Sequence, residues 1–491
     1  MTLTRGAQRA MIAVFCAAIL AVYAAAWRTP AIGLTYEDGV NLVTAESLAT
    51  GHGYSIRSLP SPVPQTKVPP LFPAVLALFT LVSRQAQWLK LVPLFATAGW
   101  LALTYRILRK MGARSGGASL LTLITAAAPT SIFLATSLLP EPLFALLLTA
   151  SLLMVLEDRP LIAGVFAGLA TVTRLAGLPL IVACMIVFLT HRRTRAAGLF
   201  TTAAMIFVAP WIGWSLAHQA PGDPATNIIT GLRASEKAVV LGANVISLFE
   251  SPFALLSGVA NVYAAFAAAL LFGWSIYKRR QLIPDLFVLL YCVTLLLRVE
   301  PPVHLMAPVL PLALWILWRA VRDVKFQEPV AAAALLFALL PLWADGKRLP
   351  ATWRNGVFPA GDQAPDDWRR LEPIFAWIRT QAPPDAAVMA NLDPMFYLYT
   401  GRKTTRGFVP DAYRLYYAPP NSQVTPDRLR AEMNANGVGY LALAPDAGFP
   451  ESAAYRRSVE ALERGGMIEP VPVSGLTADY RLFRVTGADR Y

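Results

Sequence analysis

The stretch Ala196–Leu216 reads AAGLFTTAAMIFVAPWIGWSL and contains no charged residue. Met11–Trp27 and Ser251–Tyr277 are equally free of charge. A run of about 20 apolar residues can cross a hydrocarbon core roughly 30 Å thick. Several such runs in one chain predict a bundle of membrane-spanning helices, because a helix satisfies its backbone polar groups within one segment.

The composition of the whole chain agrees with this prediction. The protein has 491 residues, of which 56% are hydrophobic and 15% are charged, whereas a soluble domain has about 25% charged residues. The net charge of +13 could suggest nucleic acid. However, the basic residues form short clusters between apolar runs, as the positive-inside rule predicts for cytoplasmic loops. We therefore expect membrane lipids, and no nucleic acid, as partners.

The basic clusters also orient the chain. Placing each of them in the cytoplasm puts the N-terminus inside and everything from residue 345 onward outside. About eleven spans result: 11–28, 88–108, 117–138, 141–157, two within 161–190 that break near Gly177 and Pro179, 197–217, 253–277, 282–299, 304–320 and 328–344.

Two regions lie outside these spans. The loop 29–87 contains Pro69–Val82, an apolar run too short to cross, which we expect to lie as a helix in the outer leaflet. The tail, 346–491, predicts an extracytoplasmic α/β domain that follows the membrane domain 1–345. In the tail we expect strands at 387–390, 439–444 and 481–485, and a helix over 394–400 that ends at Gly401.

Candidate functional residues gather on the outer side. Glu37 and Asp38 are adjacent carboxylates just after the first span. Either could act as a general base or help to bind a divalent metal, or the pair could cap the helix that follows. Lys67 could bind a phosphate at headgroup depth or serve as an ordinary interfacial anchor. Tyr54 lies between them in the loop.

Further candidates come from the predicted spans. Glu141, in the outer turn Leu139–Pro142, is either part of the site or a carboxylate at a helix N-terminus. Arg174 stands in an apolar stretch, where a charge costs about 2.5–3.5 kcal/mol, so it is either functional or half of a structural ion pair. Arg298 and His304 meet at a later outer turn, where a histidine is more often structural.

These motifs, in this order, resemble those of the GT-C glycosyltransferases, in the bacterial branch related to protein O-mannosyltransferases and lipid A aminoarabinose transferases. Glu37-Asp38-Gly39 resembles the acidic motif of their first outer loop, and Lys67-Val68-Pro69-Pro70-Leu71 their Pro-Pro-Leu segment. Glu141–Phe144 and Thr173–Gly177 are similar to further family stretches. The usual first acid is aspartate, so either Glu37 or Asp38 takes the position of the base.

The resemblance implies a multi-pass enzyme of the bacterial inner (plasma) membrane that takes a sugar from a polyprenyl-phosphate donor. The acceptor would be an extracytoplasmic hydroxyl of a lipid, a glycan or a protein. The base would be Glu37 or Asp38, and Lys67, Arg174 and Arg298 would bind the donor phosphate. The rival hypothesis is a transporter or a flippase for lipid-linked glycans, which would need polar residues at mid-membrane depth.

Overall fold

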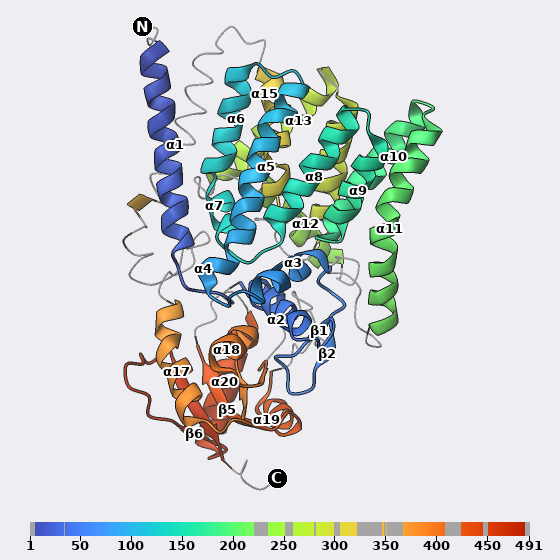
Figure 1. Cartoon of the computed structure of the whole chain (residues 1–491). Helices are drawn as coiled ribbons and strands as arrows, with labels where there is room; N and C mark the ends of the chain where they lie inside the picture. The colour runs from blue at the N-terminus through green and yellow to red at the C-terminus, as the bar shows by residue number, and fades with distance from the viewer. Residues whose placement is uncertain are drawn as a thin grey trace.

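The computed structural model describes residues 5–33, 35–219, 234–250, 259–278, 281–298, 305–321, 346–347, 350, 367–407, 424–444 and 450–486. A bundle of helices occupies one end of the molecule and a smaller domain with a sheet occupies the other (Figure 1). Three helices of the loop 29–87 lie between these two parts. The sequence predicted a membrane domain 1–345 followed by an α/β tail, and this division stays a prediction. Residue 345 lies outside the described residues, so the boundary there stays a prediction.

The described helices of the bundle are α1 (Arg5–Trp27), α5 (Leu91–Lys110), α6 (Ser115–Ala127), α7 (Pro129–Ala135), α8 (Glu141–Leu156), α9 (Pro160–Thr171), η1 (Leu175–Gly177), α10 (Leu178–Thr190), α11 (Thr194–His218), α12 (Ala234–Glu250), α13 (Val259–Lys278), α14 (Leu282–Leu296), η3 (Ala307–Val309) and α15 (Leu310–Val321). The break within 161–190, predicted near Gly177 and Pro179, spans residues 172–177 and so includes Gly177. The sequence did not predict α12, because Glu236 and Lys237 interrupt its apolar pattern.

Two stretches of helix in the described part, Ala86–Lys110 and Thr194–His218, are long and apolar enough to cross a membrane. The pair α6–α7, bent by 64°, would add a third if it forms one span. Seven further apolar helices have 10–17 residues, and the predicted span 328–344 lies outside the described residues. The expected number of about eleven spans therefore stays a prediction.

Small residues hold the bundle together where α9 meets α11. A Cβ atom added at Gly164 would lie 2.2 Å from the carbonyl oxygen of Phe200, and one at Gly168 would lie 2.6 Å from that of Ala204. The two glycines are four residues apart, so they share one face of α9. This spacing lets two helix backbones approach closely, as in other membrane bundles.

The loop 29–87 is ordered by short elements: α2 (Glu37–Ala49), the antiparallel pair β1 (Ser55–Ile56) and β2 (Val63–Pro64), α3 (Leu71–Thr80) and α4 (Ala86–Leu89). The helix expected within 69–82 is α3. Phe72 and Leu76 of α3 are fully buried, whereas Leu78 is mostly exposed, as are Leu81 and Val82 just after the helix. Large exposed apolar side chains at this end suit a helix that lies in a leaflet.

The tail contains a five-stranded sheet between two layers of helices. Its elements are α17 (Asp367–Gln381), β3 (Ala387–Met389), α18 (Asp393–Thr400), β4 (Thr404–Thr405), α19 (Pro426–Ala435), β5 (Val438–Leu443), α20 (Pro450–Arg464), β6 (Ile468–Pro470) and β7 (Arg481–Val485). The strand order is β4-β3-β5-β7-β6. The three strands and the helix expected from the sequence match β3, β5, β7 and α18 within one residue at each end, and Gly401 is left-handed at φ 71°.

Alternating side chains of these strands supply two separate cores. Val388, Tyr440 and Leu482 pack with α17 and α18 on one face. Met389, Leu441 and Phe483 pack with α19 and α20 on the other. Because successive side chains of a strand point to opposite faces, one sheet can be covered by helices on both sides.

The loop 29–87 is fastened to the tail by direct contacts. The Thr404 backbone N–H donates to the Ser58 carbonyl oxygen (2.7 Å). The Tyr399 hydroxyl donates to the Pro30 carbonyl and accepts from the Ile32 N–H, both at 3.0 Å. Gly33, at φ 94°, lies so close to Met395 that a Cβ on Gly33 would be 2.7 Å from the Met395 Cβ. The tail therefore packs directly against the segment that leads into Glu37 and Asp38.

Candidate active site

A tight turn sets the directions of the two adjacent acids. The Asp38 carboxylate is buried and accepts backbone N–H bonds from Gly33 (2.8 Å), Gly39 (2.9 Å) and Thr35 (3.2 Å). Burial raises the pKa of Asp38, while these hydrogen bonds and the charge of Lys90 oppose the rise. Asp38 thus holds the turn that leads into α2, although no side chain caps the first turn of that helix.

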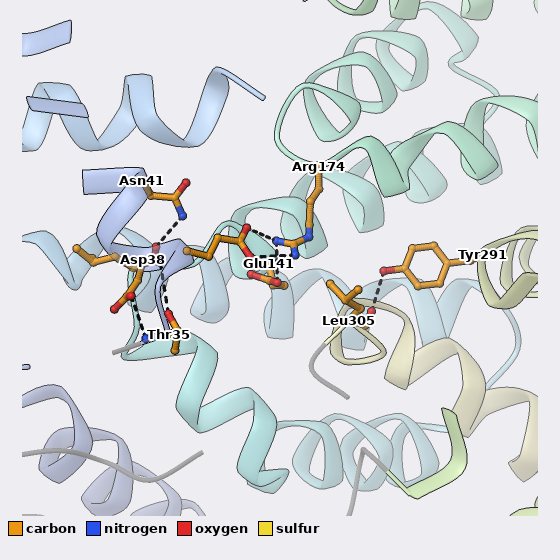
Figure 2. A network of polar contacts seen from close by, with 9 residues as sticks. Thr35, Asp38, Asn41, Glu141, Arg174, Tyr291 and Leu305 are labelled. Atoms are coloured by element: carbon orange, nitrogen blue, oxygen red, sulfur yellow. Dashed lines mark hydrogen bonds and ion pairs between the residues drawn. The ribbon is translucent and has the colours of Figure 1, made fainter. Parts of the chain in front are cut away.

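Glu37 points to a different place and joins an ion-pair cluster. The Arg174 guanidinium donates to both Glu37 carboxylate oxygens, at 2.8 and 3.3 Å. The same guanidinium lies 2.9 Å from Oε1 of Glu141 (Figure 2). The Glu141 side chain is completely buried, and those of Arg174 and Glu37 are 12% and 15% exposed. The structure therefore brings three of the predicted residues together, from sites far apart in the sequence.

Breaks in the helices make this meeting possible. Arg174 has an extended backbone, between the end of α9 and the short helix η1. Glu141 begins α8 in the turn that Pro140 and Pro142 flank, and the helix dipole favours a carboxylate at that end. The N–H of Leu71 donates to the Val172 carbonyl (3.0 Å), which ties the start of α3 to the same break.

Arg298 approaches the cluster from the end of α14. Its positive charge acts on the Glu141 carboxylate. Its carbonyl oxygen accepts a hydrogen bond from the Asn244 amide of α12 (2.8 Å), and Tyr291 nearby donates to the Leu305 carbonyl (2.7 Å; Figure 2). His304 lies outside the described residues. The helix that the sequence did not predict, α12, therefore helps to position a predicted cation.

Lys67 is half-buried in a segment that is anchored at several points. The Gln65 side-chain oxygen accepts the N–H groups of Lys67 (3.0 Å) and Val68 (3.2 Å). Trp214 and Ser215 of α11 donate to the carbonyls of residues 65 and 66. The helix α3 begins at Leu71, whose N–H donates to the Val172 carbonyl. The Lys67 segment therefore lies beside the break between α9 and η1, which carries Arg174.

Tyr54 supports the Lys67 segment. Its hydroxyl donates to the Val68 carbonyl (2.6 Å), and its ring meets Trp211 edge to face at 5.9 Å. Burial raises the pKa of Tyr54 well above its ordinary value. This residue, proposed from the sequence as an active-site candidate, is therefore placed to position Lys67.

The sequence did not reveal a contact between the tail and the turn before Glu37. Tyr36 is a non-glycine residue at φ 63°, a conformation that costs of order 1–3 kcal/mol and often occurs at functional sites. The Arg406 guanidinium covers its ring at 4.3 Å, and Nε of Arg406 lies 3.7 Å from Asp393. Residues of the tail thus hold the strained position from which Glu37 extends.

The sequence left open whether Glu37 and Asp38 help to bind a divalent metal. Their carboxylates have different partners in the structure. Across the described ranges, no three histidine, cysteine, aspartate or glutamate side chains are grouped so that they could hold a metal ion.

Neither a family model nor a curated relative matches the chain by sequence. Its structure is similar to that of ArnT from Cupriavidus metallidurans bound to undecaprenyl phosphate, with a TM-score of 0.61 over 98% of this chain and 99% of that chain, at 14% identity. The apo state of the same protein gives 0.61 over 97% and 98%, at 13% identity. The chain therefore has the fold of ArnT.

Proposed function

We propose that this protein is a membrane glycosyltransferase that moves a sugar from a polyprenyl-phosphate donor to the hydroxyl of an extracytoplasmic acceptor. The observation that carries the proposal is the cluster of Arg174 with Glu37 and Glu141. It lies in a fold shared with a protein whose structure holds undecaprenyl phosphate. We place the enzyme in a bacterial inner membrane, with the N-terminus in the cytoplasm and the tail on the opposite side.

Arg174 is suited to exchange a carboxylate for a phosphate. A guanidinium binds carboxylate and phosphate oxygens with the same two-pronged geometry. When the donor phosphate arrives, it competes with Glu37 for Arg174, and Glu141 keeps the guanidinium in place from its buried position. Arg298 and Lys67 add positive charge around the departing phosphate. In the absence of donor, Arg174 occupies both oxygens of the Glu37 carboxylate.

The transfer itself is a single displacement. Glu37 accepts the proton of the acceptor hydroxyl, whose oxygen forms a bond to the anomeric carbon of the sugar. The bond from that carbon to the phosphate oxygen breaks, and its electron pair leaves on the polyprenyl phosphate. The cations stabilise that charge as it develops. Because attack and departure occur on opposite sides, the anomeric configuration is inverted.

The assignment of Glu37 rather than Asp38 as the base rests on their partners. Three backbone N–H groups surround Asp38, and removing its charge would disturb the turn. Glu37 contacts a guanidinium that can also bind a phosphate.

The test uses purified full-length protein in nanodiscs, incubated with polyprenyl-phosphate hexoses or pentoses and a membrane extract as the source of acceptors. Mass spectrometry should detect an acceptor with a hexose- or pentose-sized mass gain, and this product should be absent with Glu37→Gln. A parallel assay would measure movement of the donor across liposome membranes. Donor movement without any transfer product would refute the proposal and favour the flippase.

A further inference from the structure

A cavity, separate from the candidate active site, lies on the far side of α2 from Arg174. Its volume is about 390 Å³, within the usual range for small-molecule sites. It opens between the loop 29–87 and the tail, and its walls include Leu42 and Glu46 of α2, Arg84 before α4, Gln87 of α4, and Tyr397 and Tyr399 of α18.

The geometry of α2 separates this cavity from the candidate active site. Glu46 follows Glu37 by nine residues, which is about two and a half turns of helix, so the two side chains leave α2 on roughly opposite faces and about 13 Å apart along its axis. Asn41 shares the face of Glu37 and donates to the Leu138 carbonyl of the bundle (3.1 Å). Leu42, which shares the face of Glu46, lines the cavity.

Arg84 and Glu46 are the charged residues in the walls of the cavity, and two further cations, Arg57 and Lys403, lie beside these walls, near Glu46 and Tyr397. Arg84 lies 3.5 Å from Glu46, and the charges of both Arg84 and Arg57 act on that carboxylate. Lys403 lies over the ring of Tyr397 at 5.9 Å and donates to the Arg57 carbonyl. The Arg57 guanidinium lies 2.8 Å from Nδ1 of His52 and 3.4 Å from the Thr50 hydroxyl. One cation in the wall and two beside it therefore accompany one carboxylate.

The walls also suit a hydroxylated ring. Tyr397 offers a half-buried aromatic face, and Gln85, Gln87 and Glu46 offer polar groups that can bind hydroxyls. Arg84 comes two residues after Val82, and the side chains of Leu78, Leu81 and Val82 are 65%, 66% and 72% exposed. If this apolar end of α3 lies in the outer leaflet, the cavity opens at headgroup depth.

We propose that this cavity is a second ligand site, which binds a sugar or polyol carrying phosphate or carboxylate groups. Arg57, Arg84 and Lys403 bind the anionic group, while Tyr397 and the polar walls hold the ring. The proposal does not depend on the reaction at Glu37. The same chemistry is found in a free sugar phosphate and in a lipid headgroup, so the test has one arm for each source.

In the first arm, native mass spectrometry compares phosphatidylinositol 4-phosphate with the neutral glycolipid monogalactosyldiacylglycerol, each bound to the full-length protein. In the second arm, saturation-transfer NMR compares glucose 1-phosphate with glucose. We expect the anionic member of at least one pair to bind at least tenfold more tightly than the neutral member. A preference in the lipid arm alone assigns the ligand to the leaflet, and a preference in the second arm alone assigns it to solution.

Variants with opposite expected effects on binding distinguish a loss of ligand contacts from a folding defect. Lys403→Gln and Arg57→Gln should each weaken binding of the preferred anion about tenfold, as expected for the loss of one charge-assisted contact. Glu46→Gln removes the repulsive carboxylate and should strengthen binding severalfold, which a folding defect cannot imitate. Arg428→Gln, on the exposed surface of α19, is the matched control and should change nothing.

Two results would overturn the proposal. One is equal binding of the anionic and neutral members, or no binding of any of them, in both arms. The other is binding of the anion with the same affinity in the wild type and in the Lys403, Arg57 and Glu46 variants.

Discussion

Arg174 and Glu37 are separated by 137 residues in the sequence, yet the guanidinium of one meets both carboxylate oxygens of the other at 2.8 and 3.3 Å. This pair joins the loop 29–87 to the break after α9, and Glu141 extends it into the bundle. The adjacent Asp38 takes no part in the pair and instead accepts hydrogen bonds from the turn before α2. Substitutions at Glu37 and Asp38 should therefore have different effects on activity and stability.

Glu37→Gln should abolish sugar transfer and leave the protein folded, because the amide keeps the shape of the side chain but cannot accept the proton. Asp38→Asn is the matched control. It should lower the free energy of unfolding by about 2 kcal/mol through its weakened hydrogen bonds, while the remaining folded enzyme keeps activity. Product formation and thermal unfolding would be followed for both. Full activity in Glu37→Gln would eliminate Glu37 as the base.

Arg174→Gln should destabilise the protein by about 3 kcal/mol, because the buried Glu141 carboxylate loses the positive charge of Arg174 that lies against it. Adding Glu141→Gln should restore much of that stability, since the buried charge is then gone. Activity should stay absent in both variants because the donor phosphate has lost Arg174. Denaturant unfolding in detergent gives the double-mutant cycle. Strictly additive losses would show that the two side chains are not coupled.

Arg406→Met should reduce kcat about tenfold or more without a comparable change in KM for the donor. Arg406 covers Tyr36 at 4.3 Å and so acts on Glu37 through the strained turn, not through the substrate. Arg406→Lys keeps the charge over the ring and should retain more activity. If both substitutions left kcat unchanged, the tail would have no part in positioning Glu37.

Anion binding at the cavity between the loop 29–87 and the tail should weaken as the pH rises through the pKa of Lys403. Partial burial, with the neighbouring charge of Arg57, lowers the pKa of Lys403 below its ordinary value. The anion prefers the protonated amine, so the loss begins at a lower pH than for an exposed lysine. Tyr397, whose pKa burial raises, and the Glu46–Arg84 pair also face this region.

The substitution Arg57→Gln should therefore raise the pKa of Lys403, because it removes a repulsive charge. Methylation of the lysines with ¹³C and NMR titration would measure that pKa directly. An unchanged or lower pKa would contradict the proximity of the two cations.

Gly164→Ala should destabilise the bundle by about 1–3 kcal/mol, because the new methyl group would meet the Phe200 carbonyl, which belongs to a helix backbone. Gly198→Ala, on the facing helix α11, is the control: a Cβ there has no neighbour within 4 Å. That change should be neutral or stabilising, since alanine favours helix. Thermal unfolding would compare them, and equal stability of the two variants would argue against close packing of α9 on α11.

The sequence predicted the elements whose signals are local. The strands β3, β5 and β7, the helix α18 and its left-handed Gly401 follow from alternation and turn chemistry. The short length of the apolar run at 69–82 predicted α3. The meeting of Glu37, Glu141 and Arg174 followed from their common placement on the outer side, together with the resemblance to a known family.

Other features depend on contacts that no local pattern contains. Neighbouring residues on a helix point about 100° apart, so the choice between Glu37 and Asp38 requires the orientation of α2. That orientation depends on the turn at Gly33, which packs against Met395 in the tail. The sequence did not predict α12 because charged residues in its first turn interrupt the apolar pattern from which a span was predicted.

The main-chain bond from Thr404 to Ser58 has a practical meaning for protein engineering. In a chimaera with the tail of another structural relative, a different residue would replace Thr404 beside Ser58, and a different side chain would replace Met395 beside Gly33. Segment 29–87 and the tail should therefore be exchanged as a single cassette, with the helices around them left in place.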